Sequence, residues 1–362
     1  MLRVCLIGLV AGGHSGVPRY AAALTGALDR VVKEFPDLSL RLLTTEPGVS
    51  AVNARHIDVD LARGPLANAT AGPGRVITEQ VLARKVNGDL LHFFDMSGPV
   101  LARRRPFVTT VHDATIRYGF EQLGVAHKHL LHPWAVRHAS AAVAVSGFAK
   151  DEAVRLFGGD PGRIHVIHSG PGLVASQGDP GPRERSPYLL YVGNLAGNKN
   201  LPFLIKAFEA AGVEERLLLV GRRGARFEEV RRAAEASPAR ERIEIRRDVS
   251  DREVDRLYRG ATVLVLPSRY EGFGFTALEA MARGCPVIAS DIPALREVSG
   301  DGAWLLPVDD EGAWVDAMRR VVADDDLRED LRNGGEATVR RYSWDRTARH
   351  VCELFLRVGS RA

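Results

Sequence analysis

Two glutamates separated by seven residues are the first candidates for chemistry. Glu271 and Glu279 lie within residues 266–282, where an apolar run leads into a turn interrupted by glycines and then into an expected helix. Such a turn offers successive backbone N–H groups to an anion or to sugar hydroxyls. The stretch therefore places carboxylates beside backbone donors, a combination suited to a polar ligand.

A pair of carboxylates is also the machinery of glycosidases, so the spacing of these two matters. If the segment were wholly helical, the rise of about 1.5 Å per residue would put them about 12 Å apart. Hydrolysis needs about 5 Å for retention and about 6.5–9.5 Å for inversion. A looped segment would shorten the distance, but the spacing disfavours a glycosidase.

A second glycine cluster, residues 11–20, follows the first apolar run. Its glycines would let backbone amides approach a phosphate, and Pro18 suits the first turn of a helix whose free N–H groups favour an anion. The spacing is not G-x-G-x-x-G, and the nearest suitable acid, Glu46, lies further along than a dinucleotide site requires. A dehydrogenase is disfavoured, and a plain tight turn without a ligand stays open.

Other residues have ordinary structural explanations. Taken alone, Lys199 is a solvated loop lysine, His112 a satisfied histidine at a strand end, and Glu279 a helix acid favoured by the helix dipole. Four histidines between residues 127 and 138 resemble a metal cluster, but no carboxylate or thiol spacing supports one. The three aspartates at 324–326 indicate a polar helix start. No metal site is expected.

Composition excludes several classes of protein. The chain has 362 residues, of which 45% are hydrophobic and 26% charged, which is typical of globular proteins with two domains. No run of about 18 apolar residues predicts a membrane span. The three scattered cysteines fit a reducing, cytoplasmic setting.

Charge is distributed unevenly along the chain. Residues 1–177 carry 19 Lys and Arg against 14 Asp and Glu, and ten of the eleven histidines. The excess of basic residues favours this half as the one that meets an anionic partner, although an unevenly charged surface explains the same count. The arginines at 103–105 are best explained as a solvated turn, with peripheral contact to the inner face of a membrane as the alternative. No nucleic-acid partner is expected.

Short apolar runs alternate with helical patterns through both halves. We expect strands at 4–7, 38–43, 90–94, 107–111 and 141–145, and then at 188–192, 217–220, 243–245, 263–266 and 286–289. Helices are expected near 17–28, 201–211 and 345–358. A Gly/Pro-rich linker at 170–187 separates the halves. The pattern predicts an α/β protein with two doubly wound parallel sheets, and ligands would bind where strands end, in a cleft between the domains.

An ordered set of motifs resembles one known family. Glu271 and Glu279 match the E-x7-E motif of family 4 retaining glycosyltransferases with the GT-B fold, two Rossmann-like domains facing each other across a cleft. Further matches lie at 112–113, 144–146, 192–194, 199–200, 266–268 and 284–290. The resemblance covers most of the chain and is more specific in the second half.

The resemblance implies roles for particular residues. Glu271 would contact the donor sugar, Lys199 would neutralise the pyrophosphate, and His112 would lie near the sugar. Glu279 would accept hydrogen bonds from the ribose hydroxyls. The implied donor-binding positions are Gly16 at the phosphates, Asn194, Val249 near the base, Gly272, Phe273, Gly274, Phe275 and Glu279.

The chain departs from the family pattern in the phosphate loop. The family usually has Arg where this chain has Asn194, and often a second basic residue where this chain has Asn198. Lys199 would then be the only cation from that loop, unless Arg222 or Arg223 substitutes.

The resulting expectation is a metal-independent hexosyltransferase without a cofactor. An acceptor-binding domain at 1–173 and a donor-binding domain at 187–345 would be followed by a helix at 346–362 that crosses back to the first domain. The donor would be a UDP-, GDP- or dTDP-sugar, and the acceptor an unknown hydroxyl. An epimerase, a phosphorylase and a non-catalytic nucleotide-sugar sensor remain alternatives.

Overall fold

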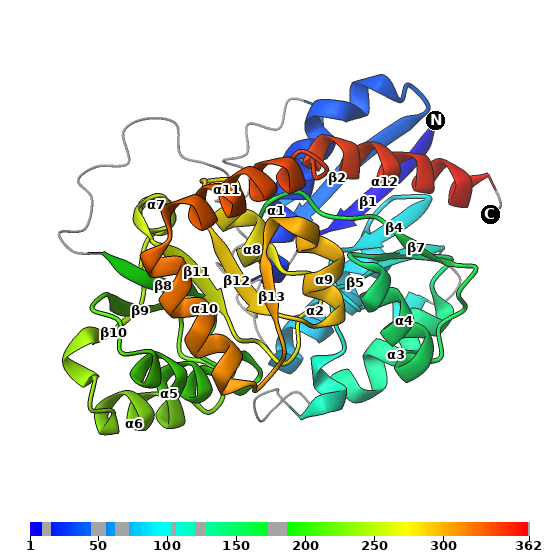
Figure 1. Cartoon of the computed structure of the whole chain (residues 1–362). Helices are drawn as coiled ribbons and strands as arrows, with labels where there is room; N and C mark the ends of the chain where they lie inside the picture. Colours follow the sequence, from blue (N-terminus) through cyan, green and yellow to red (C-terminus); the bar gives the residue numbers. More distant parts are fainter. Residues whose placement is uncertain are drawn as a thin grey trace. The chain divides into compact units, whose positions relative to one another are not determined.

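A computed structural model describes residues 1–8, 16–44, 56–61, 72–102, 106–119, 127–172 and 187–360 (Figure 1). The described chain forms two compact units. Of the described residues, the first unit contains those up to Gly119, residues 127–170, and those from Tyr342 onward. The second runs from Pro171 to Arg341.

The first unit is built on a parallel sheet. Its described strands are β1 (Leu2–Ile7), β2 (Leu38–Thr44), β3 (Asp58–Leu61), β4 (Leu90–Phe93), β5 (Phe107–Val111), β6 (Ala141–Ala144) and β7 (Ile164–Val166). They lie in the order β3-β2-β1-β4-β5-β6-β7. Chain order reverses beside β1, which is the doubly wound arrangement, and the strand ends there are where such sheets bind ligands.

Helices follow the strands of this sheet. They are α1 (Gly16–Val31), α2 (Gly72–Lys85), α3 (Lys128–His138), α4 (Gly147–Phe157) and α12 (Trp344–Gly359), with the short 3-10 helices η1 (Val32–Glu34), η3 (Val100–Ala102) and η4 (Thr115–Tyr118). Local chemistry sets their ends. In α4, the Ser146 hydroxyl accepts from the Ala149 N–H at 2.9 Å, and Gly158 at φ +70° ends the helix.

The C-terminal helix α12, drawn in red, packs within the first unit although it follows the second in sequence (Figure 1). Val351, Leu354 and Phe355 on its apolar stripe are all buried. At its start, Asp345 pairs with Arg30 of α1 at 2.6 Å. The expected helix at 345–358 lies inside the bounds of α12, and the C-terminal segment of the first unit begins at Tyr342.

The second unit repeats the architecture. Its described strands are β8 (Tyr188–Val192), β9 (Arg216–Val220), β10 (Ile243–Arg246), β11 (Val263–Leu266), β12 (Val287–Ser290) and β13 (Trp304–Leu306), in the order β10-β9-β8-β11-β12-β13. The helices are α5 (Leu201–Ala211), α6 (Phe227–Ala236), α7 (Asp251–Gly260), α8 (Phe275–Met281), α9 (Pro293–Ser299), α10 (Glu311–Ala323) and α11 (Asp325–Val339), with η5 (Gly197–Lys199), η6 (Arg240–Arg242) and η7 (Gly300–Gly302).

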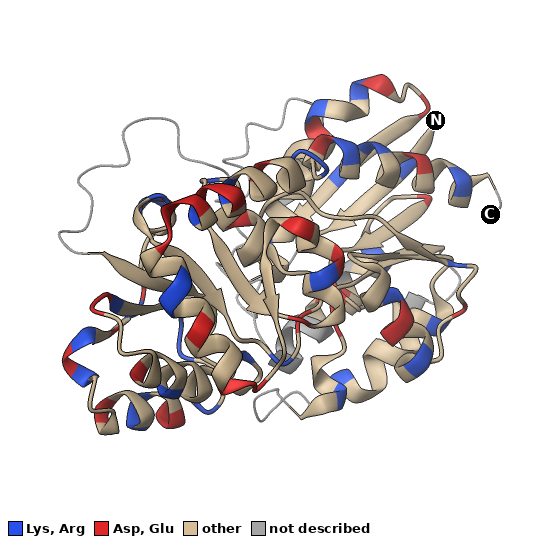
Figure 2. Ribbon diagram, viewed as in Figure 1, with Lys and Arg blue, Asp and Glu red and all other residues tan. Residues whose placement is uncertain are grey.

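The distribution of apolar and charged residues explains why helices cover the sheet of the second unit. Charged residues gather on the helices, whereas the strands of the second sheet are mostly uncharged (Figure 2). Every residue of β8, β11 and β12 is buried, as expected for parallel strands covered on both faces. The polar run at 324–326 is a helix start, because Asp324 accepts from the Leu327 N–H at 2.9 Å.

The elements expected from sequence agree closely with the structure. The helix at 201–211 coincides with α5, and the strand expected at 286–289 begins one residue later as β12. The short strands β3, β7 and β13 were not predicted. The glycine cluster at 11–15, Glu46, the arginines at 103–105 and most of the linker lie outside the described residues. Among the described helices, none is long and apolar enough to cross a membrane.

Candidate functional site

The loops that follow β8 and β9 are joined to each other at the carboxyl end of the second sheet. The Leu195 N–H donates to the Arg222 carbonyl at 2.8 Å. A Cβ at Gly221 would lie only 1.7 Å from the Gly193 carbonyl oxygen, so only glycine fits at 221. This contact places Asn194 beside the loop that carries Arg222.

The following turn is fixed to the loop after β11. The buried Asn198 side chain donates to the Tyr270 carbonyl at 3.3 Å, and the Arg269 N–H donates to the Asn198 carbonyl at 2.9 Å. Asn200, in the left-handed region at φ 55°, donates to Asp309 at 2.8 Å and precedes α5. Asn198 is therefore a structural residue of the turn that presents Lys199.

Lys199 and Glu271, 72 residues apart in sequence, form the centre of the candidate site. The Lys199 ammonium donates to Glu271 Oε1 at 2.6 Å, and the Ser268 hydroxyl donates to the same oxygen at 2.7 Å. The two charged side chains are 18% and 19% exposed. Within the described part of the chain, Glu271 Oε2 accepts no hydrogen bond. The pair is thus held in place with one carboxylate oxygen available.

Tyr191, in β8, is a buried and protonated hydrogen-bond donor close enough to Glu271 for the charge of that carboxylate to act on it. Its hydroxyl donates to the Asn194 carbonyl at 3.0 Å. Burial first, and then the charge of Glu271, raise the pKa of Tyr191 well above its ordinary value. The tyrosine stays neutral at physiological pH and braces the loop after β8.

The turn from β11 into α8 contains the second glutamate. Gly274, at φ +109°, precedes the helix, and the rings of Phe273 and Phe275 pack edge to face at 5.0 Å. Gly272 lies in the same turn. Glu279 is only 2% exposed, and its Oε2 accepts from the Tyr258 hydroxyl at 2.9 Å.

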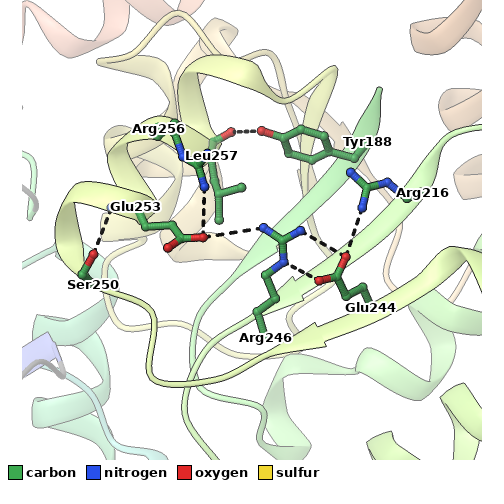
Figure 3. A network of polar contacts seen from close by, with 8 residues as sticks. All are labelled: Tyr188, Arg216, Glu244, Arg246, Ser250, Glu253, Arg256 and Leu257. Carbon is green, nitrogen blue, oxygen red and sulfur yellow. Dashed lines mark hydrogen bonds and ion pairs between the residues drawn. The ribbon is translucent and has the colours of Figure 1, made fainter. Parts of the chain in front are cut away.

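The loop between β10 and α7, where the base contact is predicted, is braced at both ends (Figure 3). Arg246, the last residue of β10, bonds Glu244 at 2.6 Å and lies 3.7 Å from Glu253 in the first turn of α7. Ser250 caps α7 by accepting from the Glu253 N–H. Val249 lies between these supports and is partly buried.

The predicted residues of the first unit, Gly16 and His112, are uncharged. Gly16 is the first residue of α1, and a Cβ placed there would meet nothing within 4 Å. His112 follows β5, and its Nε2 lies 2.7 Å from the Phe94 carbonyl oxygen. Burial lowers the pKa of His112, although the Phe94 bond and nearby aspartates oppose this. The imidazole is therefore neutral, with Nε2 donating and Nδ1 left as an acceptor.

Sequence reasoning missed two residues that support the predicted carboxylates. Ser268 lies in the matched stretch at 266–268 but was not predicted to contact Glu271, although a hydroxyl three residues before that carboxylate is a usable signal. Tyr258 lies in an amphipathic helix with no local mark of function. In the described part of the chain, no group of three or more His, Cys, Asp or Glu residues is arranged to hold a metal ion.

The family comparisons agree with this geometry. Residues 15–171 match the family described as "Glycosyltransferase Family 4", and residues 175–338 match "Glycosyl transferases group 1". Together the two matches span most of the chain, which therefore belongs to the family 4 glycosyltransferases.

Relatives and solved structures give the same result. A D-inositol 3-phosphate glycosyltransferase of Xylanimonas cellulosilytica is 32% identical over 62% of this chain, which spans 59% of that relative's length. One from Nocardioides is 28% identical over 89% of this chain and 81% of its own. Sucrose-phosphate synthase of Thermosynechococcus elongatus shares the fold over both whole chains, with a TM-score of 0.78 at 20% identity. Anabaena HepE, solved with UDP-glucose, gives 0.71 at 18% identity, covering 98% of this chain and 99% of its own. The fold is GT-B.

Proposed function

We propose that this chain transfers a hexosyl unit from a nucleoside-diphosphate sugar to an acceptor hydroxyl, with retention at the anomeric carbon and without a metal ion. The observation that carries the proposal is the Lys199–Glu271 pair at the carboxyl end of the second sheet. Parallel sheets bind ligands at this edge. The UDP-glucose bound to HepE, which shares the fold, supports a nucleotide-sugar donor.

In the proposed mechanism, charge stabilisation comes from Lys199. As the bond from the sugar to the diphosphate breaks, negative charge grows on the leaving phosphate, and a fixed ammonium stabilises it. Glu271, held through Oε1, accepts from a sugar hydroxyl through Oε2. The leaving phosphate helps to deprotonate the acceptor on the same face, so no protein nucleophile is needed.

The neutral His112 would help to orient the donor sugar. Its Nε2 proton is committed to the Phe94 carbonyl, so Nδ1 can accept from a sugar hydroxyl. The lowered pKa keeps it neutral at physiological pH. This role orients the sugar and adds no charge.

We further propose that Arg222 replaces the cation missing at Asn194. Arg222 is exposed, lies on the loop joined to the segment after β8, and forms no ion pair in the described part of the chain. Arg223, in contrast, pairs with Glu228 at 3.1 Å and lies over the Phe227 ring. A diphosphate would therefore recruit Arg222 more readily than Arg223.

The test begins with thermal stabilisation by UDP-, GDP-, dTDP- and ADP-sugars, with magnesium and with EDTA. Ligand binding raises stability by mass action, about 2.7 kcal/mol at a hundredfold excess over Kd. The proposal predicts one preferred donor that binds equally well in EDTA. Proton NMR of the product formed from an α-linked donor should then show an α linkage, and a β linkage would contradict retention.

A non-catalytic nucleotide-sugar sensor is the second candidate, favoured by the two asparagines in the phosphate loop. Asn198 is buried and its side-chain amide donates to the Tyr270 carbonyl, which supports a structural role for it in place of phosphate binding. Stabilisation by a donor without turnover across an acceptor panel, or into water, would favour the sensor over the enzyme.

A further inference from the structure

A buried hydrogen bond outside the matched motif fixes the second glutamate. Tyr258 is fully buried on α7, and its hydroxyl donates to Glu279 Oε2 at 2.9 Å. Glu279 itself is 2% exposed. A hydrogen bond to a buried carboxylate is strong and directional, because the alternative is a charged oxygen without a donor.

The buried ion pair between Arg283 and Asp255 supports both partners of the Tyr258–Glu279 hydrogen bond. Arg283 Nη1 donates to the backbone carbonyl of Glu279 at 2.8 Å, and its guanidinium lies over the Tyr258 ring at 5.6 Å. The same arginine bonds Asp255 at 2.6 Å, with both side chains at most 1% exposed. Because one guanidinium contacts the glutamate backbone and the tyrosine ring, it sets the geometry between them.

The other carboxylate oxygen of Glu279 faces a glycine. A Cβ at Gly172 would lie 2.5 Å from Glu279 Oε1 and 3.0 Å from the Phe275 ring. Any larger residue would displace the carboxylate or the ring. Oε1 therefore has a defined position that depends on the absence of a side chain at 172.

We infer that Tyr258 is a positioning residue that orients the Glu279 carboxylate for a ribose diol, and so makes this chain select ribonucleotides over deoxyribonucleotides. The inference rests on the proposed function, in which Glu279 contacts the ribose. A carboxylate only accepts hydrogen bonds, and one already fixed by Tyr258 loses less freedom when a diol binds. Discrimination against a missing hydroxyl is large when the protein group would be left unpaired.

A second buried tyrosine that contacts α7 provides a matched control. Tyr188 of β8 is also buried, and its hydroxyl donates to the Leu257 carbonyl at 2.8 Å (Figure 3). Tyr188→Phe removes one buried hydrogen bond to α7 without touching Glu279. Tyr258→Phe removes one that reaches it.

The experiment is calorimetric titration of the full chain with UDP, GDP and ADP and their 2′-deoxy counterparts. For the preferred base, we expect the parent to bind the ribonucleotide about tenfold more tightly than the deoxy form. Tyr258→Phe should reduce that ratio to about threefold or less, and Tyr188→Phe should keep it. The ratio compares two ligands on one protein, so it does not depend on the fraction that is folded.

A second variant keeps the inference testable if Tyr258→Phe folds poorly. Gly172→Ala presses on Glu279 Oε1 with the tyrosine intact, and it should also reduce the ratio. A preserved tenfold ratio in Tyr258→Phe, or in Gly172→Ala where the first variant does not fold, would overturn the inference. So would a parent that binds both forms equally. Failure of the parent to bind any of the nucleotides would overturn the proposed function, and the inference with it.

Discussion

The strand ends of the two units present opposite kinds of chemistry. In the first unit, His112 follows β5 and lies among aromatic rings, 4.7 Å from the Tyr20 ring centroid. Its burial lowers its pKa and keeps it neutral. In the second unit, Lys199 and Glu271 form an ion pair that is only partly buried. The strand ends thus carry a neutral imidazole in one unit and a charged pair in the other.

The contrast between the two units shows that a shared fold does not fix the electrostatics of its site. Parallel strand ends supply position, while the side chains of the following loops supply charge. The charged cluster suits a diphosphate, which needs cations. The neutral histidine suits a sugar, which needs oriented acceptors and donors. Under the proposed function, the diphosphate and the negative charge that develops on it would therefore be stabilised in the second unit.

Loss of the Glu271 charge should give the largest effect. We expect Glu271→Gln to reduce donor turnover about 100- to 1000-fold, because the variant loses both the anion that holds Lys199 in place and the carboxylate proposed to accept from the donor sugar. Single-turnover product formation measures this. Glu311→Gln is the control, since Glu311 also pairs with a lysine at 2.6 Å but on an exposed surface. Equal activities of the two variants would contradict the proposed role of Glu271 in donor turnover.

Acid should destabilise the protein through its buried histidines. Burial lowers the pKa of His92 to about 3, against about 6.5 unfolded. Above pH 6.5 the group is neutral in both states. Below it, only the unfolded chain binds the proton, so stability falls as pH decreases, by about 3 kcal/mol at pH 4.5. His112 acts in the same direction.

Denaturant unfolding of His92→Asn at pH 7 and 4.5 measures that contribution. The variant removes the ring whose Nε2 lies 3.1 Å from Thr110 Oγ1, and asparagine does not ionise. The variant should lose less stability on acidification than the parent. An identical pH dependence would show that the neutral histidine environment is not what responds to acid.

The smallest effect should separate the two arginines after β9. We expect Arg222→Ala to raise the donor KM about tenfold, because removal of one charged hydrogen bond costs about 1.5–3 kcal/mol. Arg223→Ala should change it less than threefold, since Arg223 is already paired with Glu228. Steady-state kinetics with the preferred donor distinguish them, and the reverse order would exclude Arg222 as the substitute cation.

The alternation of apolar runs made the fold largely predictable from sequence. The helix at 201–211 and most strands follow from burial on both faces of parallel sheets. Lys199 and Glu271 were predicted as one site, and they meet because β8 and β11 are neighbours in the sheet. The role of each remains a prediction that the experiments above address.

The supporting contacts could not be predicted, for a physical reason. Tyr258 precedes Glu279 by 21 residues in a separate helix, and its sequence pattern only indicates that it faces inward. Which side chain Tyr258 contacts depends on how α7 packs against α8. The burial of Asn198 was likewise hidden, because a polar loop residue carries no local sign of a tertiary hydrogen bond.

Binding of the donor to the second unit's cation is the most direct test of the account. The measurement is calorimetric titration of a nucleotide sugar into the parent, Lys199→Ala and Lys206→Ala, whose lysine forms an equally short but exposed pair with Glu311. We expect affinity to fall at least about tenfold in Lys199→Ala and to stay at the parent value in Lys206→Ala. Equal affinities for all three proteins would contradict the assignment of the diphosphate to Lys199.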